Sequence, residues 1–255
     1  MKWMLLFAVL VAAAKAEVGQ RIVGGEVATY GEHPYICSLQ QGVFGLFWSH
    51  ICGAVIYSNT KVVTAAHCLD GQSASSLRLL CGIHHITQTD QHQVTVNVER
   101  FTNHPSYDGS APGYPNDIGV IKTQTPIVFN SHVNSIPFAT DGDFTGQTCK
   151  LSGWGRVVGG GSTATLLKKV NMQSISSSDC RNRWSSVQGA NIDDQQHICF
   201  FAEDKSACNG DSGGPVRCGG TLTGITSWGI SSCDGTYPSV YTRVSSYINW
   251  IDSLV

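Results

Sequence analysis

The amino-acid sequence predicts an all-β fold, and a few observations carry this prediction. Short β-prone segments separated by glycine-rich turns follow one another along most of the 255 residues. In one of them, Gln93–Val98, polar and apolar side chains alternate strictly, as in a strand with one buried face. Only the end of the chain has helical spacing, with Tyr247, Ile251 and Leu254 on one face. Many short strands joined by such turns favour a sandwich or a barrel.

The individual elements follow from the same signals. Further strands are expected at Tyr35–Leu39, Lys61–Ala65, Leu77–Leu80, Ile118–Lys122, Lys169–Met172, Leu222–Trp228 and Val240–Val244. Turn-forming residues mark loops at Asp108–Pro115, Asp141–Gly146 and Gly159–Ser162. A helix is expected at the end of the chain, over about residues 245–255. The length fits one large all-β unit or two small domains.

Composition excludes several classes of protein. Hydrophobic residues make up 42% of the chain and the formal net charge is −2, whereas disordered chains combine low hydrophobicity with high net charge. Nucleic-acid binding is not expected, because such binders normally carry a basic excess. Without residues 1–21 the formal charge becomes −4, since three basic residues and one acidic residue are lost. A polyanionic partner is therefore still less plausible.

The N-terminus reads as a secretory signal peptide over residues 1–16. Lys2 precedes an apolar run, Trp3–Ala14, and Ala14-Lys15-Ala16 supplies the small residues of a cleavage site. The run is shorter than the roughly 18–20 residues that a membrane span needs. A buried N-terminal helix is the alternative, but no helix cap or amphipathic stripe surrounds the run. The sequence thus predicts a secreted, extracellular protein with no membrane partner.

Ten cysteines are an even number, and in an oxidising compartment they favour five disulfides. The chain contains no Cys-x-x-Cys, so a zinc ribbon or a thioredoxin-type site is not expected. The count alone leaves the pairing open.

Three segments carry candidate catalytic residues: Thr64–Cys68 with His67, Asn116–Val120 with Asp117, and Gly210–Pro215 with Ser212. Taken singly, His67 could equally well be a core histidine and Asp117 a turn carboxylate. Together they supply the roles of nucleophilic acyl transfer. A serine hydroxyl needs a base, which histidine can be near neutral pH, and the histidine needs an orienting carboxylate. Glycine-flanked N–H groups can stabilise the developing oxyanion.

With these residues in this order, the chain resembles the chymotrypsin family of serine proteases over residues 21–255. The resemblance implies two six-stranded antiparallel Greek-key β-barrels, over about residues 28–135 and 136–244, with a short C-terminal helix. It also implies that Ser212 is the nucleophile, His67 the general base and acid, and Asp117 the orienting carboxylate. Gly210 and Ser212 resemble the oxyanion hole. Ser227, Trp228 and Gly229 resemble the strand that pairs with the substrate backbone.

Activation is also implied by the resemblance. Residues 17–21 resemble a propeptide, and Arg21-Ile22-Val23-Gly24-Gly25 resembles the activation junction that opens the peptidase, residues 22–255. In the family the freed amine, here of Ile22, pairs with the aspartate before the serine, here Asp211. Ser38 and His50 resemble the residues that hold this aspartate in the uncut form.

Cysteine pairing follows by resemblance as well. It implies Cys52–Cys68, Cys149–Cys218, Cys180–Cys199 and Cys208–Cys233, with Cys37–Cys81 as an expected fifth pair. Two buried free thiols are the alternative for Cys37 and Cys81.

The residues that resemble the specificity pocket are Ser206, Ala207, Gly229 and Ser239. Ser206 stands where trypsin-like members carry an aspartate, so a cationic side chain would lack a partner there. We therefore expect cleavage after Phe, Tyr, Leu or Met, with an elastase-like choice of small residues as the alternative. A pocket without an acid should not cut after Arg21, so a separate trypsin-like protease is the expected activator. Activity should rise as His67 loses its proton near its ordinary pKa of about 6.5.

The sequence also gives expectations about partners, rival functions and cofactors. The resemblance implies polypeptide substrates, protein protease inhibitors as further partners, and a monomer. A catalytically inactive, protease-like binding protein is the rival function, but such proteins typically lose the serine or the histidine. No cofactor is expected, and no metal: His84, His85 and His92 lie in a segment whose only carboxylate is Asp90, whereas calcium needs several. Whether the protein serves digestion or defence is left open.

Overall fold

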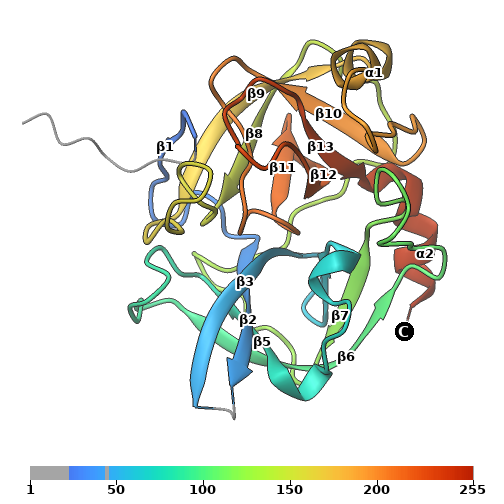
Figure 1. The fold of residues 1–255 in the computed structure, drawn as a ribbon. Coiled ribbons are helices and arrows are strands. Elements are labelled where there is room, and N and C mark those ends of the chain that lie inside the picture. The colour runs from blue at the N-terminus through green and yellow to red at the C-terminus, as the bar shows by residue number, and fades with distance from the viewer. Residues whose placement is uncertain (1–22, 44–45, 255) are drawn as a thin grey trace, which may run out of the picture.

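The computed structural model describes residues 23–43 and 46–254, and within them the chain forms two closed, six-stranded antiparallel β-barrels (Figure 1). One barrel lies above the other in this view, and the C-terminal helix packs along their side. The expected all-β class and the two-barrel architecture are confirmed. The expected signal peptide, propeptide and activation junction up to Ile22 lie outside the described residues.

The first barrel is built from six strands in the spatial order β2-β3-β4-β7-β6-β5, and β5 closes onto β2. Their bounds are β2 (Ile36–Val43), β3 (Phe47–Ile56), β4 (Lys61–Thr64), β5 (Leu77–Cys81), β6 (Val94–Asn103) and β7 (Gly119–Thr123). Aliphatic side chains such as Leu39, Leu79 and Ile121 fill the interior and are fully buried. The alternation seen in the sequence holds in β6, where Val96 and Val98 face inward.

The second barrel follows the same plan with β8 (Thr148–Gly153), β9 (Lys168–Ile175), β10 (His197–Phe201), β11 (Pro215–Cys218), β12 (Thr221–Trp228) and β13 (Ser239–Arg243). The spatial order is β9-β10-β13-β12-β11-β8, and the pairing of β8 with β9 closes the ring. Phe200 and Tyr241 meet edge to face in its core. A two-residue strand, β1 (Glu26–Val27), precedes the first barrel in the chain but pairs with β9 of the second.

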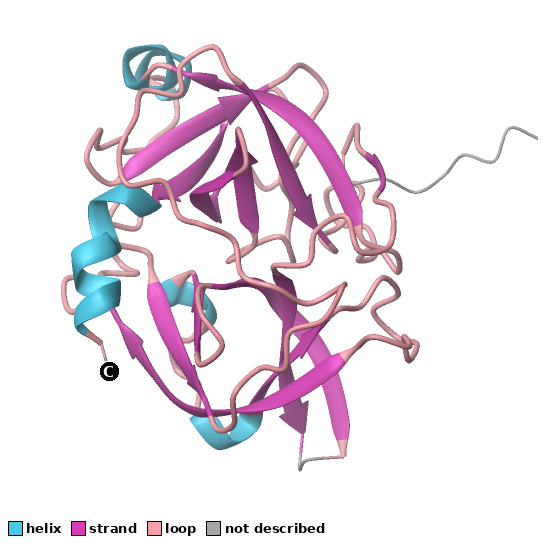
Figure 2. Ribbon diagram, turned by 180° about the vertical axis from the view of Figure 1, so that it is seen from behind, coloured by secondary structure: helices cyan, strands magenta, loops and turns pink. Residues whose placement is uncertain are grey.

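The expectation that only the chain end is helical is wrong, because α1 (Ser177–Trp184) lies between β9 and β10 (Figure 2). The Ser176 hydroxyl accepts a hydrogen bond from the Asp179 N–H at 3.1 Å and caps the helix. Only Cys180 and Trp184, one turn apart, are buried, so the helix shows too little apolar periodicity to be found from sequence. At the chain end a short 3-10 helix (Val244–Tyr247) leads into α2 (Ile248–Ser253).

Five disulfides join all ten cysteines, and they are the five pairs that the resemblance implied. Cys37 on β2 is paired with Cys81 on β5, directly opposite it in the ladder. Among the described residues no helix is long and apolar enough to cross a membrane.

Candidate active site

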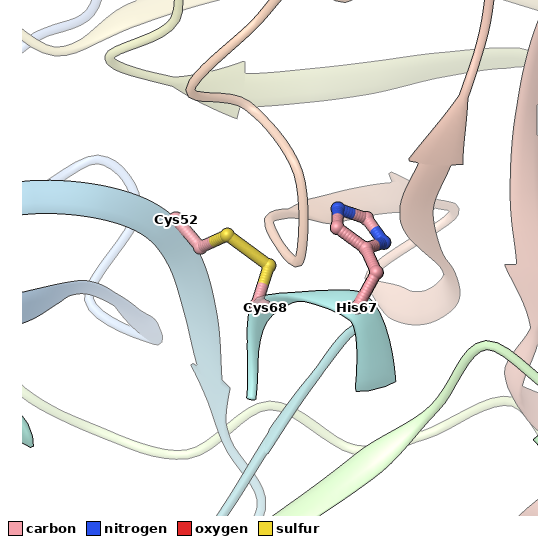
Figure 3. Close-up of side chains that lie close together, drawn as sticks. All are labelled: Cys52, His67 and Cys68. Atoms are coloured by element: carbon pink, nitrogen blue, oxygen red, sulfur yellow. A yellow bond between two sulfur atoms is a disulfide. The ribbon is translucent and has the colours of Figure 1, made fainter. Parts of the chain in front are cut away.

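His67 is placed by the short 3-10 helix Ala66–Cys68 that follows β4. The neighbouring Cys68 is tied to Cys52 on β3, and the imidazole stands beside this disulfide (Figure 3). The ligand atoms of the three residues lie within 4.8 Å of one another. Because both sulfurs belong to the disulfide, neither is a thiolate that could hold a metal ion. The disulfide instead fixes the turn that carries the histidine.

Asp117 is buried beside His67 and accepts three hydrogen bonds. Its Oδ2 lies 2.7 Å from Nδ1 of His67 and 2.5 Å from the Ser227 hydroxyl, and its Oδ1 accepts the His67 backbone N–H at 2.9 Å. Because a carboxylate only accepts, Nδ1 must carry the hydrogen, which leaves Nε2 free to take up a proton. This is the arrangement that a general base requires.

The electrostatics of His67 reflect this carboxylate. Burial lowers the pKa of the imidazole, but the hydrogen bond and the negative charge of Asp117 outweigh burial, so the pKa lies above its ordinary value. The imidazolium is therefore stabilised, which assists a base that becomes charged during the reaction. The ring stays 28% exposed and so remains accessible from the cleft.

Ser212 sits in a tight turn between Gly210 and Gly213, whose φ angles are +99° and +73°. A side chain at Gly213 would meet Oγ1 of Thr64 at 2.1 Å, so the turn requires glycine there. The carbonyl of Ser212 accepts the Gly53 N–H of β3 at 2.8 Å. The turn of the second barrel is thereby attached to the first barrel, close to the histidine.

The serine and the histidine lie on one cavity of about 400 Å³. No hydrogen bond joins the Ser212 hydroxyl to the His67 ring in the part of the chain described. Such bonds are often long in unliganded enzymes and tighten when substrate binds. No protein acceptor is recorded among the described residues for the N–H groups of Gly210 and Ser212. Both are therefore available to an incoming oxyanion.

Four residues were expected to shape the pocket, but only two of them line the cavity. Ala207 and Gly229 line the cavity, whereas Ser206 and Ser239 do not and are only 2% exposed. Ser206 donates to the carbonyl of Ala207 at 2.7 Å and lies 3.3 Å from the Ser239 hydroxyl, which accepts the Ala207 N–H at 3.1 Å. These two serines therefore hold the backbone behind the cavity wall, and no acidic side chain is among the described residues that line the cavity.

The end of β12 forms another wall of the cavity. Ser227, Trp228 and Gly229 all line it, and the strand is bulged between Thr226 and Trp228. Trp228 packs edge to face against Trp184 of α1, with ring centroids 5.0 Å apart. No neighbouring atom lies within 4 Å of where a Cβ on Gly229 would stand, so this glycine leaves the cavity open.

Asp211 is fully buried, and its two carboxylate oxygens accept the N–H groups of Gly155 (2.8 Å) and Cys208 (3.0 Å). Burial raises its pKa to about 6, with the two hydrogen bonds acting in the opposite direction. Among the residues described no cation pairs with it. The expected partner, the amine of Ile22, and the expected cleavage residue Arg21 lie outside the described residues.

His50 contacts a different atom from the one expected. Its Nε2 lies 2.9 Å from the carbonyl of Gly210, and its Nδ1 lies 2.8 Å from the Ser38 hydroxyl, so the histidine does not hold Asp211. Burial lowers the pKa of His50 to about 4, although the bond to Gly210 acts against this. The neutral ring donates to the carbonyl and accepts from the serine. It thus positions the turn before Ser212.

Several residues of the cavity, chief among them Tyr114, could not be found from the sequence. It has a positive φ of 49°, and its ring centroid lies 6.4 Å from that of His67. The run Gly113-Tyr114-Pro115 marked only a loop, and nothing in it indicated that the ring would face the histidine. Other lining residues that were missed are Asn209, Thr226, Ile230 and Ser231, whereas the disulfide Cys208–Cys233, which was expected to brace the pocket, does line it.

The histidine-rich loop of the first barrel is organised around its one carboxylate. Oδ2 of Asp90 accepts the backbone N–H groups of His84 (2.7 Å) and His85 (3.2 Å). His92 instead stacks on His132, with ring centroids 4.2 Å apart. The Asp90 carboxylate therefore stabilises the turn by accepting its backbone N–H groups.

Comparisons with known proteins agree with this fold. Residues 22–251 match the model of the trypsin family. A chymotrypsin-like serine proteinase of Haliotis rufescens is 44% identical, covering 98% of this chain and 97% of that protein. A fibrinolytic enzyme, isozyme C, of Lumbricus rubellus is 40% identical (90% and 98%), and trypsin beta of Drosophila erecta is 36% identical (97% and 98%). The chain belongs to the trypsin family of serine proteases and is a serine endopeptidase, with polypeptides as substrates.

Proposed function

We propose that this protein is a secreted endopeptidase that cleaves after Phe, Tyr, Leu or Met and is made as an inactive precursor. The observation that carries the catalytic part is the short contact between Asp117 and His67 at the edge of the cavity that Ser212 lines. The observation that carries the specificity is that no acidic side chain of the described chain lines that cavity.

The proposed reaction passes through an acyl-enzyme. Ser212 Oγ attacks the substrate carbonyl carbon while Nε2 of His67 takes up the hydroxyl proton, and Asp117 stabilises the imidazolium. The N–H groups of Gly210 and Ser212 bind the developing oxyanion. The imidazolium then gives its proton to the leaving amine, and water releases the acyl group by the same steps in reverse.

The proposed specificity follows from charge and space. A Lys or Arg side chain in the cavity would be removed from water without an anionic partner, because none of the described residues that line the cavity is acidic and the residues behind its wall, Ser206 and Ser239, are neutral. A large apolar side chain gains from burial there, and Gly229 leaves room for it. The name of the Haliotis rufescens relative, a chymotrypsin-like serine proteinase, supports the same preference.

The proposed activation uses the buried Asp211. Residues 1–16 are proposed to be a signal peptide and 17–21 a propeptide, removed by a trypsin-like protease that cuts after Arg21. The amine of Ile22 would then neutralise a carboxylate that is costly to bury alone. Five disulfides support a secreted location, since such bonds persist in oxidising compartments.

A cleavage profile tests this function. The chain is cut after Arg21 with trypsin, trypsin is inhibited, and cleavage of a peptide library is followed by mass spectrometry. We expect kcat/KM to be largest for P1 Phe, Tyr, Leu or Met; highest values for P1 Arg or Ala overturn the proposal. The Ser206→Asp variant, prepared in the same way, should gain activity toward P1 Lys and Arg. A Ser212→Ala control shows that the measured cleavage belongs to this chain.

A further inference from the structure

The backbone just before Asp117 is held in an unusual conformation. Asn116 has a φ angle of +56°, in the left-handed region that residues other than glycine seldom occupy. Its carbonyl accepts the Ile118 N–H at 2.7 Å, which closes a three-residue turn with Asp117 at its centre. The direction of the Asp117 carboxylate therefore depends on the backbone of Asn116. Such a conformation persists only where the surrounding structure enforces it.

Side chains from both halves of the molecule anchor this turn. The side-chain amide of Asn116 donates to the carbonyl of Ser106 at 2.9 Å, and its Oδ1 accepts the Tyr247 hydroxyl at 3.1 Å. The Thr242 hydroxyl of β13 donates to the carbonyl of Asp117 at 2.7 Å. The backbone N–H of Asn116, whose direction changes with the φ angle, is bound by a further side chain.

Gln196, which directly precedes β10 of the second barrel, binds this N–H. Its Oε1 accepts the Asn116 N–H at 2.8 Å, and its Nε2 donates to Oδ2 of Asp193 at 2.8 Å. The two partners fix the orientation of the side-chain amide, because a backbone N–H only donates and a carboxylate only accepts. The carbonyl of Gln196 accepts the Arg243 N–H of β13 at 2.8 Å. Gln196 therefore connects the second barrel to the residue before Asp117.

We propose that Gln196 is a positioning residue for Asp117: it holds Asn116 in the left-handed conformation and so keeps the carboxylate against His67. The inference rests on the proposed catalytic roles of Asp117 and His67. Gln196 is not among the described residues that line the cavity, so it acts through the backbone and not on the substrate. Without it, the φ angle of Asn116 can relax toward the ordinary negative region. The carboxylate then moves away from Nδ1 of His67, and the imidazolium is less stabilised.

The acidic limb of the pH–rate profile reports this contact. Burial lowers the pKa of His67, but the hydrogen bond and the charge of Asp117 hold it above its ordinary value, so a weakened contact lowers it. The other titratable groups that interact with the carboxylate are Tyr107, His197 and Tyr247. Burial raises the pKa of both tyrosines and lowers that of His197. Neither direction brings a second titration to the limb expected above about pH 6.5.

Two variants and a matched control test the role of Gln196. Gln196→Met keeps the length of the side chain and removes both hydrogen bonds. Gln196→Glu with Asp193→Asn reverses the pair: the new carboxylate accepts from Asn116 and from the new amide, whose Oδ1 can still accept the Gln195 N–H. The control is Gln195→Ala, which truncates an exposed neighbouring side chain with no hydrogen bond among the described residues.

Each precursor is cut after Arg21 with trypsin, trypsin is inhibited, and active sites are counted by organophosphorus labelling of Ser212. Misfolded molecules therefore do not enter kcat. With the best peptide substrate of the wild type, we expect Gln196→Met to lower kcat by about tenfold to a hundredfold, with KM within about twofold. Its acidic limb should move to lower pH. The reversed pair should restore kcat to within about threefold and the limb to its wild-type position, and Gln195→Ala should match the wild type.

The outcomes separate this inference from the proposed function. Gln196→Met with the kcat and acidic limb of the wild type overturns the positioning role, and so does a loss that the reversed pair does not restore. Asp117→Asn is measured alongside. If it loses less than about tenfold in kcat, the proposed roles of Asp117 and His67 fail and this inference fails with them. If it loses more while Gln196→Met loses nothing, only the role of Gln196 is overturned.

Discussion

Oδ2 of Asp117 lies between two donors from different barrels, Nδ1 of His67 at 2.7 Å and the Ser227 hydroxyl at 2.5 Å. His67 follows β4 of the first barrel, and Ser227 belongs to β12 of the second. The carboxylate therefore fixes the histidine and also joins the two halves of the cleft. Its removal should affect the tautomer of His67 more than the fold.

Asp117→Asn tests this role. The amide can present a donor to Nδ1, which favours the wrong tautomer and leaves Nε2 unable to take up a proton. In the chymotrypsin family, to which this chain is related, the equivalent change lowers kcat about 10⁴-fold, and we expect the same order here. KM should change little. Steady-state kinetics measures both, and a loss of less than tenfold contradicts the assigned role.

The pH dependence of kcat/KM should reflect the raised pKa of His67. Only the neutral ring accepts the proton, so activity should fall as the pH drops through a pKa above about 6.5. The contribution of the His67–Asp117 pair to folding stability depends on pH in the opposite way. It is complete below the ordinary pKa of histidine and is lost as the pH rises through the pKa of His67 in the folded protein. A pH–rate profile with an acidic limb at or below 6.5 is inconsistent with the contact to Asp117.

The buried Asp211 should make the uncut chain less stable as the pH rises. Its folded pKa of about 6 lies above the ordinary value of about 3.9, so the folded chain holds the proton more tightly. Stability should decline between these two values, by about 3 kcal/mol at most. The Asp211→Asn variant is the comparison. It loses one hydrogen-bond acceptor, and the resulting change in stability does not depend on pH.

Thermal unfolding of the uncut wild type and Asp211→Asn between pH 4 and pH 7 measures this effect. The melting temperature of the variant should rise relative to that of the wild type as the pH rises. A difference in melting temperature that is independent of pH means that burial does not raise the pKa of Asp211. Activated Asp211→Asn should also lose most of its activity although cleavage after Arg21 still occurs.

Gly229→Val should convert the large cavity into a small one. The valine side chain enters space in which no other atom lies within 4 Å of the new Cβ. We expect kcat/KM for P1 Phe to fall about 100-fold or more, roughly 3 kcal/mol, while P1 Ala is spared. Labelling of Ser212 with an organophosphorus reagent counts active sites as the control. An unchanged preference for Phe means that large side chains bind elsewhere.

Removal of the Cys37–Cys81 disulfide should affect stability and not catalysis. The bond closes a loop between residues 44 positions apart, and such a crosslink contributes about 2–4 kcal/mol. The Cys37→Ala/Cys81→Ala variant should therefore unfold at a lower temperature. Its kcat/KM at 25 °C should stay within twofold of the wild type. Unchanged unfolding would show that the pairing of β2 with β5 is sufficient by itself.

Much of the fold could be predicted, because its strands carry local signals. β6 and β9 alternate between buried and exposed side chains, which a sequence displays directly. β3 was not found, since polar residues such as Ser49 and His50 interrupt its outer half. β8, β10 and β11 were not found either, and β11 is short and begins with Pro215.

The candidate site could be predicted only in part, for a related reason. His67, Asp117 and Ser212 lie in short segments of unusual composition, which the sequence makes visible. The ring of Tyr114 reaches the cleft through a loop, and Ser227 reaches Asp117 from the other barrel, so both depend on tertiary packing. Ser206 and Ser239 were expected in the cavity, but their bonds to Ala207 draw them behind its wall.

The pairing of Glu26 and Val27 with β9 has a consequence for the proposed activation. These residues follow Ile22 closely in the chain, yet they belong to the barrel that also carries Asp211. In the proposed activation, the segment that follows the new terminus and the carboxylate that is proposed to receive it therefore belong to the same barrel. We expect this activation to proceed without rotation of one barrel against the other.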